Sequence, residues 1–248
     1  MCAYPLYLYQ PDYLLLSDRG NYKLIKMENK NETLKDTALI LEYKIREAHN
    51  QSQKPGLIVL LHGVGSNEED LFRQAGKFPT DFVVVSARAP YTLAPGRYAW
   101  FQVDLSKGKP VINPEQAEKS RLVLNTFVNQ LIERYSIDAN KVYMGGFSQG
   151  GIMSYSVGLT FPQKFKGIFI LSSRLLPEVK PLIKAGAALE QLKVFIAHGT
   201  HDEVLPLAYA HEAKAYLEEL TPNITYNEYE MGHTTSEKEL AHLLEWLH

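Results

Sequence analysis

Cysteine is almost absent from this sequence, and so is any excess of positive charge. The single cysteine, Cys2, among 248 residues leaves no partner for an internal disulfide and no basis for a cysteine zinc cluster. It fits a reducing, cytoplasmic setting. Lysine and arginine total 26 against 28 aspartates and glutamates, a net charge of −2. With no basic surplus to contact phosphates, nucleic acid is not an expected partner.

Long hydrophobic runs are also missing. No apolar stretch approaches the roughly 18 residues of a membrane span, and the longest candidate, 57–61, has the length of a strand. The first residues lack the basic segment and apolar core of a signal peptide. We therefore expect no stable membrane insertion and a cytoplasmic location. The sequence does not distinguish a monomer from a homodimer.

The composition that remains is that of a folded globular chain. Hydrophobic residues make up 45% and charged residues 22%. A chain of this length buries roughly 75% of its unfolded surface, so we expect one domain over 1–248. Residues 1–36 are rich in Tyr and Leu and then turn polar. We interpret them as an N-terminal extension packed on the sheet edge, with a turn or loop near Asn29–Asn31; a lid or dimerisation arm is the alternative.

Short apolar runs alternate with amphipathic stretches from Leu39 onward. The runs at 56–61, 81–86, 141–144, 167–171 and 193–197 suit strands buried on both faces of a parallel sheet. Segments 39–46 and 225–230 alternate and predict two further strands. Helices are expected over 114–135, 149–161, 205–220 and 236–247. This order predicts an α/β fold, with a mostly parallel central sheet and helices on both faces.

One strand runs directly into a Gly-x-Ser-x-Gly pentapeptide at Gly146–Gly150. In such a sharp strand-to-helix turn, the backbone is strained and the hydroxyl of Ser148 projects above the sheet. Glycines on either side are required because strand and helix approach closely there. The N-terminus of the following helix faces any anion that forms at this point. The motif therefore predicts Ser148 as a nucleophile.

A serine nucleophile needs a base, and the base needs an acid that orients it. In this arrangement both follow the serine, each after a later strand. Asp202 follows the strand at 193–197, with Glu203 as the competing acid, and His233 lies in a loop before the last helix. Together these residues predict a Ser148–His233–Asp202 triad. His198 and His201 flank the acid, but their spacing is not that of a metal site, so no metal and no cofactor are expected.

The first buried strand ends in His62-Gly-Val-Gly, where hydrolases of this kind supply a backbone oxyanion donor. The glycines let the Val64 N–H turn toward the site. The second donor is the N–H of Gln149, directly after the nucleophile. Candidates for the pocket that binds the substrate lie in the long stretch at 89–104, expected to be irregular, and behind two other strands. They are Trp100, Phe101, Leu175, Leu176, Val204 and Leu205.

These segments together resemble the phospholipase/carboxylesterase family of α/β-hydrolases, the branch that includes acyl-protein thioesterases. The resemblance rests on 62–71, 97–101, 146–151, 198–202 and Gly232-His233, and it covers roughly residues 55–248. It implies an α/β-hydrolase fold and a serine esterase with no cofactor. It also implies that the residues named above act as triad and oxyanion donors, and that Trp100 lines the site. The chain departs from thioesterase members at Ser66, where they usually carry Asp, and in its longer N-terminal segment.

The function expected from the sequence is therefore hydrolysis of a small-molecule carboxylic ester through an acyl-enzyme. A thioesterase or lysophospholipase of the same family is the first alternative. A hydrolase-like binding protein without catalysis is a more remote one, because such proteins usually lack a triad residue and here all three are present.

Overall fold

The structure is a computed structural model that describes residues 13–18, 21–26, 38–49, 53–104 and 111–248. It divides into two compact units, Met1–Thr37 and Ala38–His248. Each unit is described by itself. The expected packing of residues 1–36 on the sheet edge therefore stays a prediction.

The first unit contains a two-stranded sheet. Strands β1 (Tyr13–Asp18) and β2 (Asn21–Lys26) pair antiparallel, with Asp18 opposite Asn21. The turn expected near Asn29–Asn31 lies outside the described residues.

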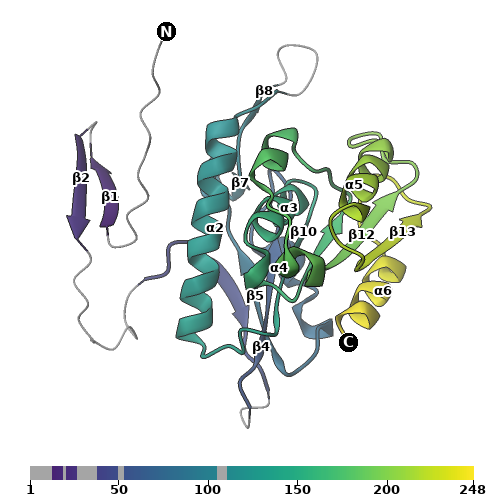
Figure 1. The fold of residues 1–248 in the computed structure, drawn as a ribbon, viewed down its shortest axis with the longest axis horizontal. Coiled ribbons are helices and arrows are strands. Elements are labelled where there is room, and N and C mark those ends of the chain that lie inside the picture. Colours follow the sequence, from purple (N-terminus) through teal and green to yellow (C-terminus); the bar gives the residue numbers. More distant parts are fainter. Residues whose placement is uncertain (1–12, 19–20, 27–37, 50–52, 105–110) are drawn as a thin grey trace. The chain divides into compact units, whose positions relative to one another are not determined.

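The second unit is built on a seven-stranded sheet in the order β13-β12-β11-β10-β4-β5-β3 (Figure 1). The edge strand β3 (Tyr43–Arg46) runs antiparallel to its neighbour β5. The other six strands are parallel. They are β4 (Gly56–Leu61), β5 (Phe82–Ala87), β10 (Val142–Phe147), β11 (Gly167–Leu171), β12 (Lys193–Gly199) and β13 (Ile224–Tyr229).

Helices cover both faces of this sheet, as the sequence predicts. Alternate residues of β4 point to opposite faces, so Leu57 and Val59 join one core cluster and Ile58 and Leu60 the other. The first cluster includes side chains of α2 (Pro114–Arg134), α3 (Gln149–Thr160), α4 (Ala187–Gln191) and α5 (Ala208–Glu218). The second includes α6 (Glu237–Leu247) and the 3₁₀ turn η2 (Ala75–Lys77), with α1 (Glu69–Phe72) packed against it. Two further 3₁₀ segments are η3 (Pro162–Lys164) and η4 (Pro177–Leu182).

Local sequence signals explain where the long helices begin. The Asn113 side chain accepts a hydrogen bond from the Gln116 N–H at 3.1 Å, and Pro114 occupies the first helical position of α2. Ser236 and Glu239 form a capping box at the start of α6. The helix expected from residue 205 begins later, at Ala208, because the Leu205 N–H is bonded to the Asp202 side chain and Pro206 follows.

The stretch at 89–104, expected to be irregular, instead contains short strands. β6 (Tyr91–Ala94) and β7 (Arg97–Ala99) form a hairpin whose turn holds Gly96 at a φ of +71°. β8 (Val103–Asp104) pairs with β9 (Val111–Ile112). Strands of two to four residues are too short to show a periodic pattern, which is why the sequence did not reveal them.

Helix length and hydrophobicity bear on membrane association. None of the helices in the described ranges is both long and apolar enough to span a bilayer.

Candidate active site

Ser148 occupies a strained turn between β10 and α3. Its backbone has φ +52° and ψ −117°, a conformation that side-chain-bearing residues rarely adopt. A Cβ atom at Gly146 would lie 2.3 Å from the Leu61 carbonyl oxygen, and one at Gly150 only 1.9 Å from it. The two glycines therefore let β10 and α3 press against the end of β4. The turn is held from the other side by the Ser148 N–H, which donates to the Leu171 carbonyl at 2.9 Å.

Ser148, His233 and Asp202 lie in one hydrogen-bonded chain. His233 Nε2 is 2.9 Å from the Ser148 Oγ, and His233 Nδ1 is 2.7 Å from the Asp202 Oδ2. The Phe147 ring packs against the imidazole at 4.8 Å between centroids. The structure thus brings together three side chains from distant parts of the sequence. The arrangement allows His233 to accept the serine proton while the carboxylate fixes its tautomer.

Asp202 is the acid that faces His233, and the competing Glu203 is exposed. Both oxygens of the buried Asp202 carboxylate are bonded. Oδ2 faces His233, while Oδ1 accepts the N–H groups of Val204 and Leu205 at 2.9 and 2.8 Å. These two bonds hold the carboxylate in one orientation.

His198 contacts the turn at 202–205 that carries Asp202. Its Nε2 lies 2.7 Å from the Leu205 carbonyl and 3.3 Å from Asp202 Oδ2, and burial lowers its pKa. A neutral ring with its proton on Nε2 donates to Leu205. His201 is exposed and contacts Thr200 Oγ1 at 3.2 Å. Across the described ranges, no three His, Cys, Asp or Glu residues are grouped so as to hold a metal ion.

The loop after β4 carries the first predicted oxyanion donor. A Cβ at Gly63 would lie 3.5 Å from the Ser148 Cβ, so this loop borders the nucleophile. His62 is fully buried, burial lowers its pKa, and its Nε2 accepts the Ala89 N–H at 3.1 Å. Its other nitrogen, Nδ1, therefore carries the proton and donates to the Gly63 carbonyl at 2.7 Å. This bond orients the peptide unit whose N–H belongs to Val64.

The second predicted donor, the Gln149 N–H, is the first of α3 and has no carbonyl one turn earlier within the helix. Val64 and Gln149 both line the groove that contains Ser148. The two predicted donors thus belong to residues that line the same groove as the nucleophile, and their oxyanion role stays a prediction.

The Gln149 side chain has a bracing role that the sequence did not indicate. Its Oε1 accepts the Trp100 N–H and its Nε2 donates to the Phe101 carbonyl, each at 2.7 Å. The Trp100 indole N–H in turn donates to the His62 carbonyl at 3.0 Å. Trp100 is fully buried and lies outside the groove lining. The prediction that Trp100 lines the groove is therefore wrong: its indole N–H is used to hold the loop that follows β4.

A mostly apolar groove of about 1040 Å³ surrounds Ser148. Of the predicted pocket residues, Phe101, Val204 and Leu205 line it, whereas Leu175 and Leu176 are buried in the core and do not. Most of the remaining apolar lining comes from the β6, β8 and β9 segments and from residues next to Ser148. These residues are Val64, Leu93, Val103, Val111, Ile112, Pro114 and Ile152. Val64, Leu93, Val111 and Val204 each expose more than 40% of their surface, which suits an apolar substrate.

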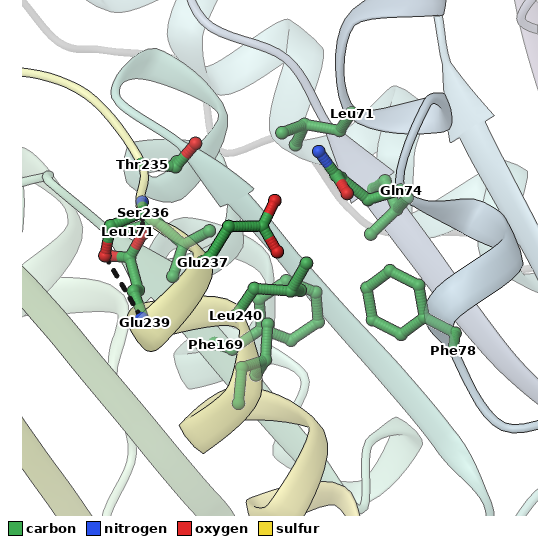
Figure 2. Close-up of a pocket in the computed structure, with 12 residues that line it drawn as sticks. Leu71, Gln74, Phe78, Phe169, Leu171, Thr235, Ser236, Glu237, Glu239 and Leu240 are labelled. Atoms are coloured by element: carbon green, nitrogen blue, oxygen red, sulfur yellow. Dashed lines mark hydrogen bonds between the residues drawn. The ribbon is translucent and has the colours of Figure 1, made fainter.

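A second, smaller cavity of about 180 Å³ lies on the face of the sheet that α6 covers, between α6 and the α1–η2 segment (Figure 2). Ser148 is not part of its lining. Glu239 lines it with only 1% of its surface exposed, and one carboxyl oxygen, Oε1, has no hydrogen-bond partner. Burial raises the pKa of Glu239 to about 7.

This raised pKa makes stability depend on pH. The carboxyl is neutral in both states below pH 4.5, and the folded state resists ionisation as the pH rises through 7. The free energy of unfolding therefore falls as the pH rises from 4.5 to about 7, by up to about 3 kcal/mol. We expect Glu239→Gln, which keeps the capping box, to match the wild type at pH 4 and to be more stable at pH 8. Urea unfolding at both values measures this. The exposed Glu237→Gln serves as control, and an equal difference at both pH values would contradict the assignment.

Known proteins are similar to this chain in sequence and in architecture. A family model described as Phospholipase/Carboxylesterase matches residues 44–248. The chain belongs to the phospholipase/carboxylesterase family. Among curated relatives, acyl-protein thioesterase 1 of Kluyveromyces lactis is 28% identical over 219 residues, which is 82% of this chain and 95% of the relative.

Solved structures of similar proteins have the same fold. The crystal structure of esterase PE8 aligns with a TM-score of 0.72 and 25% identity, over 84% of this chain and 97% of that one. A Bacillus cereus carboxylesterase aligns with a TM-score of 0.71 and 25% identity, over 84% and 93%. The fold is that of the α/β-hydrolases, which confirms the predicted fold class and the predicted family.

Proposed function

We propose that this family member is a serine hydrolase that cleaves small carboxylic esters by way of an acyl-enzyme. The observation that carries the proposal is the hydrogen-bonded chain from Ser148 through His233 to Asp202, opening on an apolar groove. Membership of the carboxylesterase and acyl-protein thioesterase family supports it.

The hydrogen bonds of the triad support the following mechanism. His233 Nε2 takes the proton of Ser148 as its Oγ attacks the ester carbonyl, and the proton then goes to the leaving alcohol. Asp202 stabilises the imidazolium. The Val64 and Gln149 N–H groups hold the oxyanion. Water activated by His233 then releases the acid and restores Ser148.

A panel of p-nitrophenyl esters of increasing acyl length tests this function. The groove's apolar lining leads us to expect kcat/KM to rise from acetate to medium chains. If the protein hydrolysed none of these esters, the result would contradict the esterase function and favour the non-catalytic alternative.

A thioesterase or lysophospholipase activity uses the same residues and is the first alternative. Three substrates of equal acyl length distinguish the esterase, thioesterase and lysophospholipase activities. They are the soluble ester, the matching S-acyl thioester and a micellar lysolipid. We expect the soluble ester to have the highest kcat/KM; a preference for the micellar lipid would replace the esterase assignment.

A triad of this kind needs no metal to activate its nucleophile. We expect EDTA, at roughly a thousandfold excess over the enzyme, to leave the rate of ester hydrolysis unchanged. Loss of activity that Zn²⁺ or Mg²⁺ restores would contradict a mechanism based on Ser148 alone.

A further inference from the structure

Arg174 lies beside the nucleophile and lines the groove. It follows Ser173, whose hydroxyl donates to the Ser148 carbonyl oxygen at 2.7 Å. We propose that Arg174 forms an anion subsite and that the physiological substrate is an ester that carries a carboxylate or phosphate group. This inference rests on the proposed esterase function and names the substrate class of that site.

The guanidinium of Arg174 has its donors available. It stacks over the Tyr209 ring at 5.4 Å, and in the described part of the chain it makes no ion pair and no hydrogen bond. Other arginines near the fold's surface are occupied: Arg88 pairs with Glu68 and Glu42, and Arg121 pairs with Glu118. A guanidinium keeps its charge at all working pH values and matches carboxylate and phosphate groups with two parallel hydrogen bonds.

The sheet order places this charge on one side of Ser148. β10, which leads to Ser148, lies between β4 and β11. Val64 follows β4 and Arg174 follows β11, so the two flank the nucleophile from opposite sides. The bridge between Ser66 and Tyr98 ties the β6–β7 hairpin to the loop after β4, so Leu93 of β6 lies on the β4 side of the groove.

This arrangement favours a substrate that has an apolar part and an anionic part. The apolar part fits the side of the groove that the β6–β7 hairpin borders, where Leu93 is exposed. The anionic part fits the Arg174 side; among the described residues that line the groove, Arg174 carries the positive charge. The stack on Tyr209 limits the freedom of Arg174 and lowers the entropy lost when an anion binds.

Two pairs of esters test the subsite, one for each position of the charge. Mono-4-nitrophenyl adipate, which carries the carboxylate on its acyl part, is compared with the neutral 4-nitrophenyl hexanoate. 4-Acetoxybenzoate, which carries the carboxylate on its leaving group, is compared with its neutral methyl ester. A third comparison replaces each carboxylate with a phosphonate and distinguishes the two kinds of anion. The readout is the ratio of kcat/KM for the anionic ester to that for its neutral partner.

We expect one pair to favour the anionic ester in the wild type. Arg174→Gln should lower that ratio roughly 10- to 100-fold, the range for a hydrogen bond to a charged group. Arg174→Lys should retain part of it, since the charge remains. Added NaCl should reduce the wild-type ratio. Tyr209→Phe keeps the aromatic ring and is the matched control that should preserve the ratio.

Three results would overturn the subsite. They are a wild-type preference for both neutral esters, a ratio that Arg174→Gln does not change, and an equal loss on both members of a pair, which indicates a packing role. In each of these cases ester hydrolysis itself persists. Hydrolysis of none of the esters would overturn the esterase function, and the subsite with it.

Discussion

Ser148→Ala should lower kcat/KM for 4-nitrophenyl esters by a factor of roughly 10⁴ to 10⁶. The hydroxyl is the atom that attacks the carbonyl, and no other group in the site replaces it. The variant should fold, because among the described residues the Ser148 side chain bonds only to His233 Nε2, while its backbone bonds to Leu171 and Ser173 remain. Initial rates and the melting temperature measure the two expectations.

Ser156→Ala is the matched control. Ser156 lies on α3, the helix that follows Ser148, and its hydroxyl donates to the Ile152 carbonyl at 2.8 Å. We expect this variant to hydrolyse the ester at close to the wild-type rate. Activity of Ser148→Ala within tenfold of the wild type, in a folded protein, would show that another group is the nucleophile.

Asp202→Asn has the second largest expected effect, a loss of about 10⁴ in kcat. Oδ1 of Asp202 accepts two backbone N–H groups, from Val204 and Leu205, so the amide oxygen of Asn takes that place. The NH₂ group then faces His233 Nδ1, which must accept rather than donate. The imidazole proton moves to Nε2, and Nε2 is no longer able to take the serine proton.

The neighbouring Glu203→Gln distinguishes this effect from a general loss of local charge. Glu203 is exposed, and it is Asp202 that bonds His233. We expect the Glu203 variant to retain the wild-type rate. If Glu203→Gln abolished turnover and Asp202→Asn did not, the acid would have been assigned to the wrong residue.

The sequence was most informative where a residue type is tied to backbone geometry. The glycines around Ser148 are required by the approach of the Leu61 carbonyl, and this constraint is visible as a Gly-x-Ser-x-Gly pattern. The buried strands were equally visible, because β4 and β5 are apolar on both faces. Asp202 and His233 could be proposed from their order after later strands, and the structure brings them to Ser148.

The groove was harder to predict because its shape depends on contacts between distant segments. Trp100 was expected to line it, yet its indole N–H bonds the His62 carbonyl and draws the ring into the core. Leu175 and Leu176 are likewise turned inward, and no local pattern distinguishes an inward from an outward leucine. Arg174 is a single residue outside any motif, so only its place beside Ser148 makes it a candidate.

The most direct test of the account is the site of covalent modification by a fluorophosphonate, which reacts with an activated serine. Intact mass followed by peptide mapping should show one adduct per chain, on Ser148, and no adduct in Ser148→Ala. An adduct on a different serine, or equal labelling of the Ser148→Ala variant, would contradict the central claim that Ser148 is the activated nucleophile of this fold.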